Sequence, residues 1–450
     1  MSGASIETTR STGFASALAR REGVRVRRAR SQRWLVALAA LLSLVLLGAD
    51  ANILVDASRG STSNVPYSPP IAGWLAKLGI GEPLRYSVLV QTLLVSSVAY
   101  VGLILLVRSR RNPISARWGI GLVATLELIV FVAPVLFATD IFNYIDYARL
   151  AVLHGVNPYV HGPAAAASDP FYRYISSDWI HWPTPYGPLF TLVSYAAAPL
   201  GVDGAVWAMK AEALLASAGT LALTWRCARA RGLDPVAAIV VVGLNPFYLL
   251  YTLGGSHNDL TMMFAMMAGV SLTLADGTSA RRQAAGAAAV VAGVFVKATA
   301  AVMLPFMIVS QRRLAPIVGA LGALAVGVIV GYAAFGLRGI DVVAELNRQD
   351  GLVSSHSFAD RLAYLFGASS VSSTEHTLLT VGLAAILLYL LWRTWQGYDW
   401  IAATGWALLA IAVTTTWLMA WYTVWPLPLA VISRDRRLLV STLCIQLLWL

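Results

Sequence analysis

The stretch WLVALAALLSLVLLGADANILV, residues 34–55, decides the class of fold. As a helix, this apolar run is long enough to cross the ~30 Å hydrocarbon core of a bilayer. Comparable runs recur along the chain, which is 58% hydrophobic and 12% charged, with a mean hydropathy of +0.68. Soluble domains carry about 25% charged residues. We therefore predict an all-α, polytopic membrane bundle with about 10–13 transmembrane or membrane-entering helices.

Basic residues predict which helix ends face the cytoplasm. The net charge is +11, and Lys and Arg gather in short loops such as RSRRNPISAR, residues 108–117. Such residues collect on the cytoplasmic side, so we assign this loop and an Arg-rich tail, residues 1–33, to the inside. The membrane domain then runs from 34 to 450, with large outer loops at 139–187 and 336–376. The scattered basic residues do not predict a nucleic-acid partner.

The same alternation of loops sets the remaining membrane segments. An odd number of crossings must lie between 187 and 226, so we take 188–201 as an interfacial helix. Parity makes 284–309 a hairpin with Lys297 towards its outer side. It makes 400–433 a second hairpin, whose outer turn carries Trp417, Trp421, Tyr422 and Trp425. The predicted single spans are 34–55, 88–107, 118–138, 206–225, 236–252, 260–275, 315–335 and 377–395.

The first candidate catalytic residue is Asp140, in TDIFNYIDYARLAVLHGVNPY, residues 139–159. It directly follows an apolar span, and Tyr144 and Tyr147 follow it at helical spacing, so the three side chains share one face. A carboxylate among aromatic rings at a membrane border is partly desolvated, which suits a general base. The alternative is that Asp140 only ends the preceding helix and meets water.

Two further runs combine polar and aromatic residues with turn formers. In WPTPYGPLF, residues 182–190, proline and glycine predict a turn, and the aromatic residues predict either a belt at the headgroup level or a surface for sugar rings. In LNPFYLLYTLGGSHNDL, residues 244–260, two glycines allow a close turn before His257, Asn258 and Asp259. These three polar residues predict a phosphate site at a helix start, or a plain N-cap.

Lys297 lies in an apolar segment, GVFVKATAAV. It predicts an anionic partner such as a phosphate, or a lysine that snorkels to the interface. The chain has no GxxxxGK[ST] or GxGxxG signature for a soluble nucleotide, so we expect the donor of any transferred group to be a membrane lipid. Its two cysteines lie far apart, and we expect neither a metal site nor a cofactor.

Taken together, the motifs resemble a known family. The set runs from about residue 120 to 310 and includes Asp140, Tyr144, Gly155, Asn157-Pro158-Tyr159, Pro163, Tyr186-Gly187-Pro188, Asn245-Pro246 and His257-Asn258-Asp259. It is similar to the actinobacterial polyprenol-phosphate-mannose-dependent α-1,6-mannosyltransferases, of the GT-C class of membrane glycosyltransferases. Each motif alone is weak, whereas the joint pattern is fairly specific.

The resemblance implies an activity and a location. It implies transfer of mannose from polyprenyl-phosphomannose to a mannan or lipoglycan acceptor, in an inverting reaction that makes an α-1,6 linkage. The site would lie outside the plasma membrane and serve cell-envelope biosynthesis, which agrees with the outward position of the sparse acids and histidines. Alternatives are another sugar on the same carrier, such as arabinose or glucose, a flippase for lipid-linked sugars, or a non-catalytic scaffold.

The resemblance also implies roles for individual residues. Asp140 matches the acidic residue that such enzymes carry in their first large outer loop, and it would act as the base. Gly255 to Asp259 match a second motif in a later outer loop. His257 and Lys297 would bind the donor phosphate. The residues expected to bind the sugar or the acceptor are Tyr144, Tyr147, Trp182, Tyr186, Asn258 and Asp259.

Overall fold

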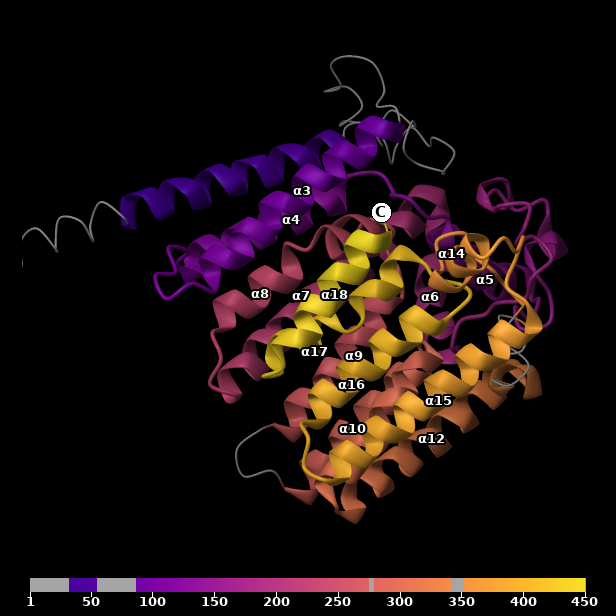
Figure 1. Ribbon diagram of the computed structural model, residues 1–450. Coiled ribbons are helices and arrows are strands. Elements are labelled where there is room, and N and C mark those ends of the chain that lie inside the picture. Colours follow the sequence, from indigo (N-terminus) through magenta and orange to yellow (C-terminus); the bar gives the residue numbers. More distant parts are fainter. Residues whose placement is uncertain (1–31, 55–85, 275–278, 342–347, 349–350, 450) are drawn as a thin grey trace, which may run out of the picture.

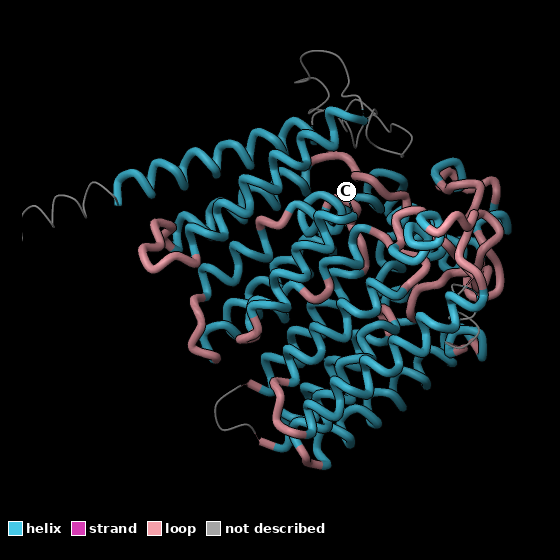
Figure 2. Tube along the Cα trace, in the orientation of Figure 1, coloured by secondary structure: helices cyan, strands magenta, loops and turns pink. Residues whose placement is uncertain are grey.

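The computed structural model describes residues 32–54, 86–274, 279–341, 348 and 351–449. These residues form helices joined by loops, without a strand among them (Figure 2), and the predicted all-α membrane bundle is confirmed. The basic tail, residues 1–33, lies almost wholly outside the described residues.

Within the part of the chain that the structure describes, five helices are long and apolar enough to cross a membrane. They are Gln32–Leu54, α3 (Tyr86–Val107), the run Pro188–Ala230, α12 (Leu314–Phe335) and α15 (Ser373–Trp395). The pair α8 (Pro235–Gly243) and η4 (Phe247–Leu253), bent by 52°, makes a sixth if counted as one span. Four shorter apolar segments are also present: α9 (Asp259–Thr273), Ala298–Gln311, α16 (Trp400–Thr414) and Ala420–Ile432. The count of 10–13 transmembrane or membrane-entering helices stays a prediction.

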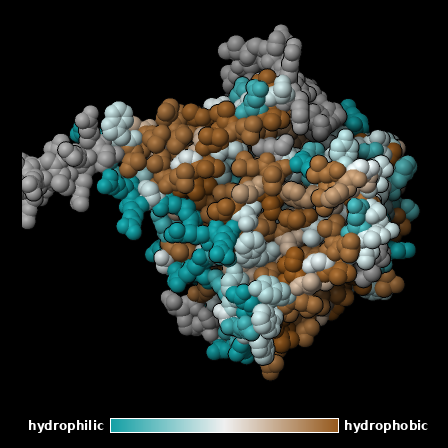
Figure 3. Space-filling view, in the orientation of Figure 1, coloured by the Kyte–Doolittle hydropathy of each residue, from teal (hydrophilic) through white to brown (hydrophobic). Residues whose placement is uncertain are grey.

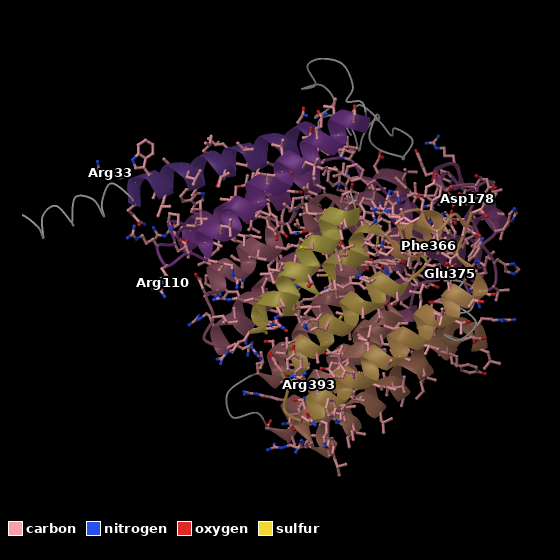
Figure 4. The ribbon with its side chains drawn as sticks, viewed as in Figure 1. Arg33, Arg110, Asp178, Phe366, Glu375 and Arg393 are labelled. Carbon is pink, nitrogen blue, oxygen red and sulfur yellow. The ribbon has the colours of Figure 1, made fainter. Side chains whose placement is uncertain are left out.

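The surface separates apolar flanks from polar ends. In Figure 3 hydrophobic residues cover most of the visible helix faces, and hydrophilic residues gather at opposite edges. Figure 4 places Arg33, Arg110 and Arg393 towards one end and Asp178 and Glu375 towards the other. Because α15 begins beside Glu375 and ends beside Arg393, the charge difference follows the helix direction. This distribution has the form that the positive-inside rule predicts.

The predicted span 118–138 is shorter in the structure. Helix α4 (Ala116–Val132) ends at Val132, and Ala133 takes an extended conformation before Pro134. Proline lacks an N–H and disfavours helical conformation in the residue before it, so the apolar run cannot continue as one helix. Lys210 caps the end of α4 by donating to the carbonyl of Ala133 at 2.6 Å.

The predicted interfacial helix and the span after it form one long path. It comprises α6 (Pro188–Ser194), η3 (Tyr195–Leu200) and α7 (Gly201–Ala230), so the long helix begins before and ends after the predicted 206–225. The location of 188–201 at a membrane surface stays a prediction.

Both predicted hairpins are present. Helix α10 (Ala280–Val294) leads to an extended turn at Lys297, and η5 (Ala298–Val302) and α11 (Met303–Gln311) return. Gly319, near the start of α12, lies against Ala284 near the start of α10, so the chain has come back to the end where it entered. The second hairpin runs through α16, η7 (Ala420–Val424) and α17 (Leu427–Ile432). Asp435 joins its ends by accepting hydrogen bonds from Tyr398 and Trp406.

Small residues bring the central helices close together. A Cβ on Gly269 of α9 would lie 2.8 Å from the carbonyl oxygen of Gly286 on α10. A Cβ on Gly319 of α12 would lie 2.1 Å from the carbonyl oxygen of Ala284. Lipid tails are as apolar as leucine, so close packing of this kind holds helices together in a bilayer. It fixes the helices on either side of the Lys297 turn.

The remaining elements lie outside this packed centre. Figure 1 shows α5 (Asp140–His154) and α14 (Phe358–Leu365) at the same end of the bundle. Short 3₁₀ turns lie in the same two large loops: η1 (Pro163–Ala166), η2 (Tyr172–Tyr174) and η6 (Leu337–Ile340). The chain ends in α18 (Arg436–Trp449), which packs beside α17.

Candidate active site

Four segments that are distant in sequence meet at one place. Asp140 opens α5, and His257 and Asp259 lie at the start of α9. Lys297 lies at the turn after α10, and Trp421 belongs to η7. The structure thus brings together Asp140, the motif around His257 and Lys297, all of which the sequence singled out. The second hairpin, which the sequence did not assign to the site, joins them.

The chain before Asp140 is tied to the chain before His257. The N–H of Leu136 donates to the carbonyl of Gly254 at 2.9 Å. Gly254 is required here, because a Cβ would lie 2.3 Å from the carbonyl oxygen of Leu250 and 2.6 Å from the Leu136 side chain. This contact confirms the expectation that the glycine pair permits a close turn. It also fixes Asp140 and His257 relative to each other.

Asp140 and His257 form the first polar contact of the site. His257 Nδ1 lies 3.2 Å from Asp140 Oδ2. The histidine side chain is 0% exposed, whereas that of Asp140 is 27% exposed. The imidazole stacks on Trp421, with ring centroids 3.7 Å apart. Asp140 therefore keeps part of its side chain accessible, while His257 contacts it from the buried side.

Asp259 and Lys297 form the second contact. Lys297 Nζ donates to Asp259 Oδ1 at 2.8 Å, and Trp425 Nε1 donates to the same oxygen at 2.5 Å. The ammonium also lies 4.5 Å from the ring centroid of Tyr422. Asp259 is 0% exposed and the Lys297 side chain 21% exposed, so only the lysine of this pair has any exposed surface. The alternative that Lys297 snorkels to the interface is not what the structure shows.

The turn that carries Lys297 is fixed by the run WPTPYGPLF. Gly187 N–H donates to the carbonyl of Val296 at 3.1 Å, and Leu189 N–H donates to that of Phe295 at 3.0 Å. A Cβ at Gly187 would lie 2.1 Å from the Phe295 oxygen, so only glycine allows this approach. Hydrogen bonds of the backbone, rather than flexible side chains, thus hold Lys297 in place.

The predicted aromatic residues line the same region. Tyr186 packs edge-to-face on Tyr144, with ring centroids 4.6 Å apart, and contacts Tyr147 at 6.2 Å. Tyr144 Oη accepts from the N–H of Asn258 at 3.4 Å, and Tyr147 Oη donates to the carbonyl of Trp182 at 2.8 Å. Tyr144 and Tyr147 therefore share one face of α5, as their spacing predicted.

Burial determines what these phenols can do. It raises the pKa of Tyr144 and of Tyr186 well above the ordinary value, and the nearby Asp140 raises both further. Both phenols keep their protons at neutral pH, so they can donate hydrogen bonds but cannot serve as bases. Asp140 is the partly exposed carboxylate beside them.

The plain N-cap interpretation of Asn258 and Asp259 does not hold. Asn258 occupies the N-cap position of α9, yet its side chain accepts no capping hydrogen bond. Among the described residues, Asn258 Nδ2, Asp259 Oδ2 and both ring nitrogens of His257 lack a directed hydrogen-bond partner, although all are buried. Buried polar atoms normally have partners, so this group has unused capacity for a ligand.

Three aromatic residues of the site were not predicted. Trp421, Tyr422 and Trp425 were expected near the outer turn of the second hairpin, and no ligand or contact was assigned to them. Their density in a turn was a signal. The contact between this turn and α9 joins positions more than 160 residues apart, so the local sequence pattern could not predict it.

Nothing in the described ranges forms a group of three or more His, Cys, Asp or Glu side chains that could hold a metal ion. Within the site, Lys297 already places a cation beside Asp259. The expectation that no metal or cofactor takes part remains a prediction.

The fold and site define a polytopic helical membrane protein with an acid–histidine–lysine centre at one end of its bundle. Residues 44–313 match the family model described as "Alpha-(1->6)-mannopyranosyltransferase, N-terminal domain". The chain therefore belongs to this family, and the resemblance seen in its motifs is confirmed.

Individual relatives agree with this assignment. The alpha-(1->6)-mannopyranosyltransferase A of Mycobacterium tuberculosis is 27% identical over 349 residues, which cover 70% of this chain and 66% of the relative. The protein of the same name from Corynebacterium glutamicum is 30% identical over 190 residues, covering 42% of this chain and 37% of the relative. The matched region thus covers less than two thirds of the length of each of these two relatives. No solved structure matches the chain.

Proposed function

We propose that this protein is an inverting mannosyltransferase that uses polyprenyl-phosphomannose and extends a mannan or lipoglycan acceptor through an α-1,6 linkage. The observation that carries the proposal is the juxtaposition of Asp140 and Lys297. The partly exposed side chains of an aspartate and a lysine lie at one site, each fixed by a buried partner. A base and a cation are what glycosyl transfer from a phosphate requires.

The reaction follows from these two groups. The acceptor 6-hydroxyl oxygen attacks the anomeric carbon, and the bond between that carbon and the phosphate oxygen breaks. Asp140 takes the hydroxyl proton, and the bond electrons leave with the phosphate. The transition state has oxocarbenium character, as in glycoside hydrolysis. Lys297 stabilises the negative charge that grows on the departing phosphate. A single displacement converts a β-linked donor to an α-linked product.

Burial refines the roles of the other candidates. His257 was expected at the phosphate, but its fully buried ring contacts Asp140, so its first role is to orient the base. Asp259 was expected at the sugar, and its Oδ1 instead holds Lys297 and Trp425. Tyr144, Tyr147, Tyr186 and Asn258 remain the candidates for contacts to sugar hydroxyls. Buried, protonated phenols are suited to that role.

The proposed orientation places the site outside the plasma membrane. The arginine-rich loops lie at the end of the bundle away from α5, and Lys and Arg favour the cytoplasmic side. The N-terminal tail, residues 1–33, would then be cytoplasmic, and the loops 139–187 and 336–376 would face outward. A flippase would need charged groups accessible from both sides, whereas here the site groups collect at one end.

A membrane assay with radiolabelled polyprenyl-phosphomannose and a short α-1,6-mannoside acceptor tests the proposal. We expect transfer by the wild-type protein and a loss of about 10³-fold in the Asp140→Asn variant, within the range for removal of a general base. Asp341→Asn, an exposed carboxylate in the second outer loop, is the matched control and should retain activity. Equal transfer by Asp140→Asn and wild type would overturn the role of Asp140.

Parallel donors carrying arabinose or glucose test the choice of sugar. Transfer of arabinose or glucose in place of mannose would show that the donor carries that sugar and not mannose. Absence of transfer with all three, combined with movement of the lipid-linked sugar across proteoliposomes, would favour the flippase.

A further inference from the structure

Three tryptophans from two distant segments meet beside the candidate active site. Trp179 and Trp182 belong to the first outer loop, and Trp417 belongs to the second hairpin. The ring centroid of Trp179 lies 5.3 Å from that of Trp182 and 6.1 Å from that of Trp417, in edge-to-face contacts. All three are half-buried, so part of each indole faces outward. We call this set the tryptophan cluster.

Backbone hydrogen bonds fix both sides of the tryptophan cluster. On one side, Ala164 N–H donates to the carbonyl of Ile180, and Thr184 N–H donates to that of Pro158, both at 2.8 Å. On the other side, Ser354 N–H donates to the carbonyl of Thr416 at 2.8 Å. A surface that is already ordered loses little entropy when it binds a ligand. The cluster is thus a prepared surface and not a set of loose side chains.

The tryptophan cluster continues the site in two directions. Trp182 lies four positions before Tyr186, which packs on Tyr144. Trp417 lies four positions before Trp421, which stacks on His257. Four residues span at most ~14 Å even when fully extended. An oligosaccharide whose terminal sugar lies at Asp140 would therefore reach the tryptophan cluster within a few sugar units.

The exposed groups around the cluster favour a carbohydrate. The indole N–H groups of the three tryptophans have no hydrogen-bond partner among the described residues. The neighbouring Asp178 and His181 are exposed. Indole combines a broad apolar body with a polar handle, and the carboxylate and imidazole can bind hydroxyl groups. Sugar rings present both an apolar face of C–H groups and a rim of hydroxyls.

We propose that the tryptophan cluster is an acceptor subsite that binds the mannose units preceding the one that is extended. The inference rests on the proposed transferase function and adds a feature to it: a preference for longer acceptors. A disaccharide would occupy the space near Asp140 alone, whereas a longer oligomannoside would also cover the indoles. The alternative, an aromatic belt at the headgroup level, would affect membrane insertion or stability and not acceptor length.

The test compares KM for an α-1,6-mannobiose and an α-1,6-mannohexaose at saturating donor. In the wild type we expect the lower KM for the hexaose. Trp417→Ala and Trp179→Ala should raise KM for the hexaose about 3–10-fold, the loss expected for one aromatic stacking contact. KM for the biose and kcat should change by less than about two-fold, because neither tryptophan touches Asp140, His257 or Lys297 in the structure.

Two controls make the result decisive. Trp392→Ala removes an exposed tryptophan near the opposite end of α15 and should leave both KM values unchanged. Trp417→Phe keeps a ring and should restore most of the hexaose preference. If Trp417→Ala does not fold, Trp179→Ala carries the test. Equal loss for both acceptors, or no loss for either, would overturn the subsite.

A binding measurement separates this proposal from the proposed reaction. Titration of the purified protein in nanodiscs with mannohexaose alone, without donor, should show binding that weakens 3–10-fold in Trp417→Ala. If wild-type transfer fails with every donor but this binding persists, the reaction is wrong and the subsite stands. If transfer occurs but hexaose binding is the same in both proteins, the subsite is wrong and the reaction stands.

Discussion

Two polar clusters near the same end of the molecule differ in how completely they are satisfied. In the first outer loop, Asp169 accepts hydrogen bonds from Arg149 at 2.9 Å, from His154 at 2.7 Å and from the N–H of Phe171. At the candidate active site, His257 and Asp259 are just as buried but keep polar atoms without directed partners. Saturated bonding holds a loop in shape, and unfilled bonding leaves capacity for a ligand.

Breaking the saturated cluster should have the largest effect, and that effect should be on stability. Asp169→Asn removes the charge that pairs with the buried Arg149 and should cost about 3–5 kcal/mol of unfolding free energy. Thermal unfolding in detergent, read beside activity per folded protein, is the measurement. A normal melting temperature with lost activity would show that Asp169 belongs to the reaction.

Breaking the unfilled cluster should affect activity and leave the fold intact. Lys297→Gln removes the cation at the departing phosphate, and we expect kcat to fall about 10²–10³-fold. Arg338→Gln, an exposed cation in the second outer loop, serves as control and should stay within two-fold. If Lys297→Gln unfolds the protein, Lys297→Arg tests the same point, with partial activity expected. Full activity in a folded Lys297→Gln variant would remove the lysine from the mechanism.

A smaller change tests whether Trp425 positions Lys297 through Asp259. Trp425→Phe keeps an aromatic ring beside the ammonium but removes the N–H that donates to Asp259 Oδ1. Loss of one hydrogen bond to a charged group predicts a fall in kcat of roughly 10-fold. Trp421→Phe, which keeps its ring on His257, should lose less than about three-fold. Equal effects would indicate general packing and contradict a specific role for the indole N–H.

The last prediction concerns pH and Asp146, a buried carboxylate beside the loop cluster. Burial, followed by the nearby Asp169, raises the pKa of Asp146 to about 7, while Arg149 and His154 oppose this shift. The folded protein thus holds a proton that the unfolded chain releases above pH 4, so stability falls as pH rises from about 4 to 7. The slope is at most about 1.4 kcal/mol per pH unit. Asp146→Asn should flatten the melting temperature over this range, and an unchanged slope would rule out Asp146 as its origin.

The sequence was most informative where one segment carries its own signal. The apolar runs predicted the bundle and both hairpins, and helical spacing placed Tyr144 and Tyr147 on one face of α5. Proline chemistry could also have predicted the early end of α4, since Pro134 is visible in the run. Asp140 became a candidate because a carboxylate directly after a span is unusual.

Contacts between segments were not predictable in the same way. The pairing of Lys297 with Asp259 and the stacking of Trp421 on His257 join positions 38 or more residues apart. No periodicity in either segment encodes such a contact, because it depends on how helices pack. The same limit made His257 a phosphate ligand in the prediction, whereas its burial in the structure places it behind Asp140.

The contribution of the second hairpin to the site has a consequence for how the protein is made. Membrane helices enter the bilayer in order during synthesis, from the N-terminus onward. Asp140, His257 and Lys297 are all in place before residues 421–425 leave the ribosome, yet the imidazole lacks its stacking partner and Asp259 lacks one of its two donors until then. A nascent chain would therefore contain Asp140, His257 and Lys297 before it contains the tryptophans that contact His257 and Asp259. Activity should begin only after the second hairpin has been inserted.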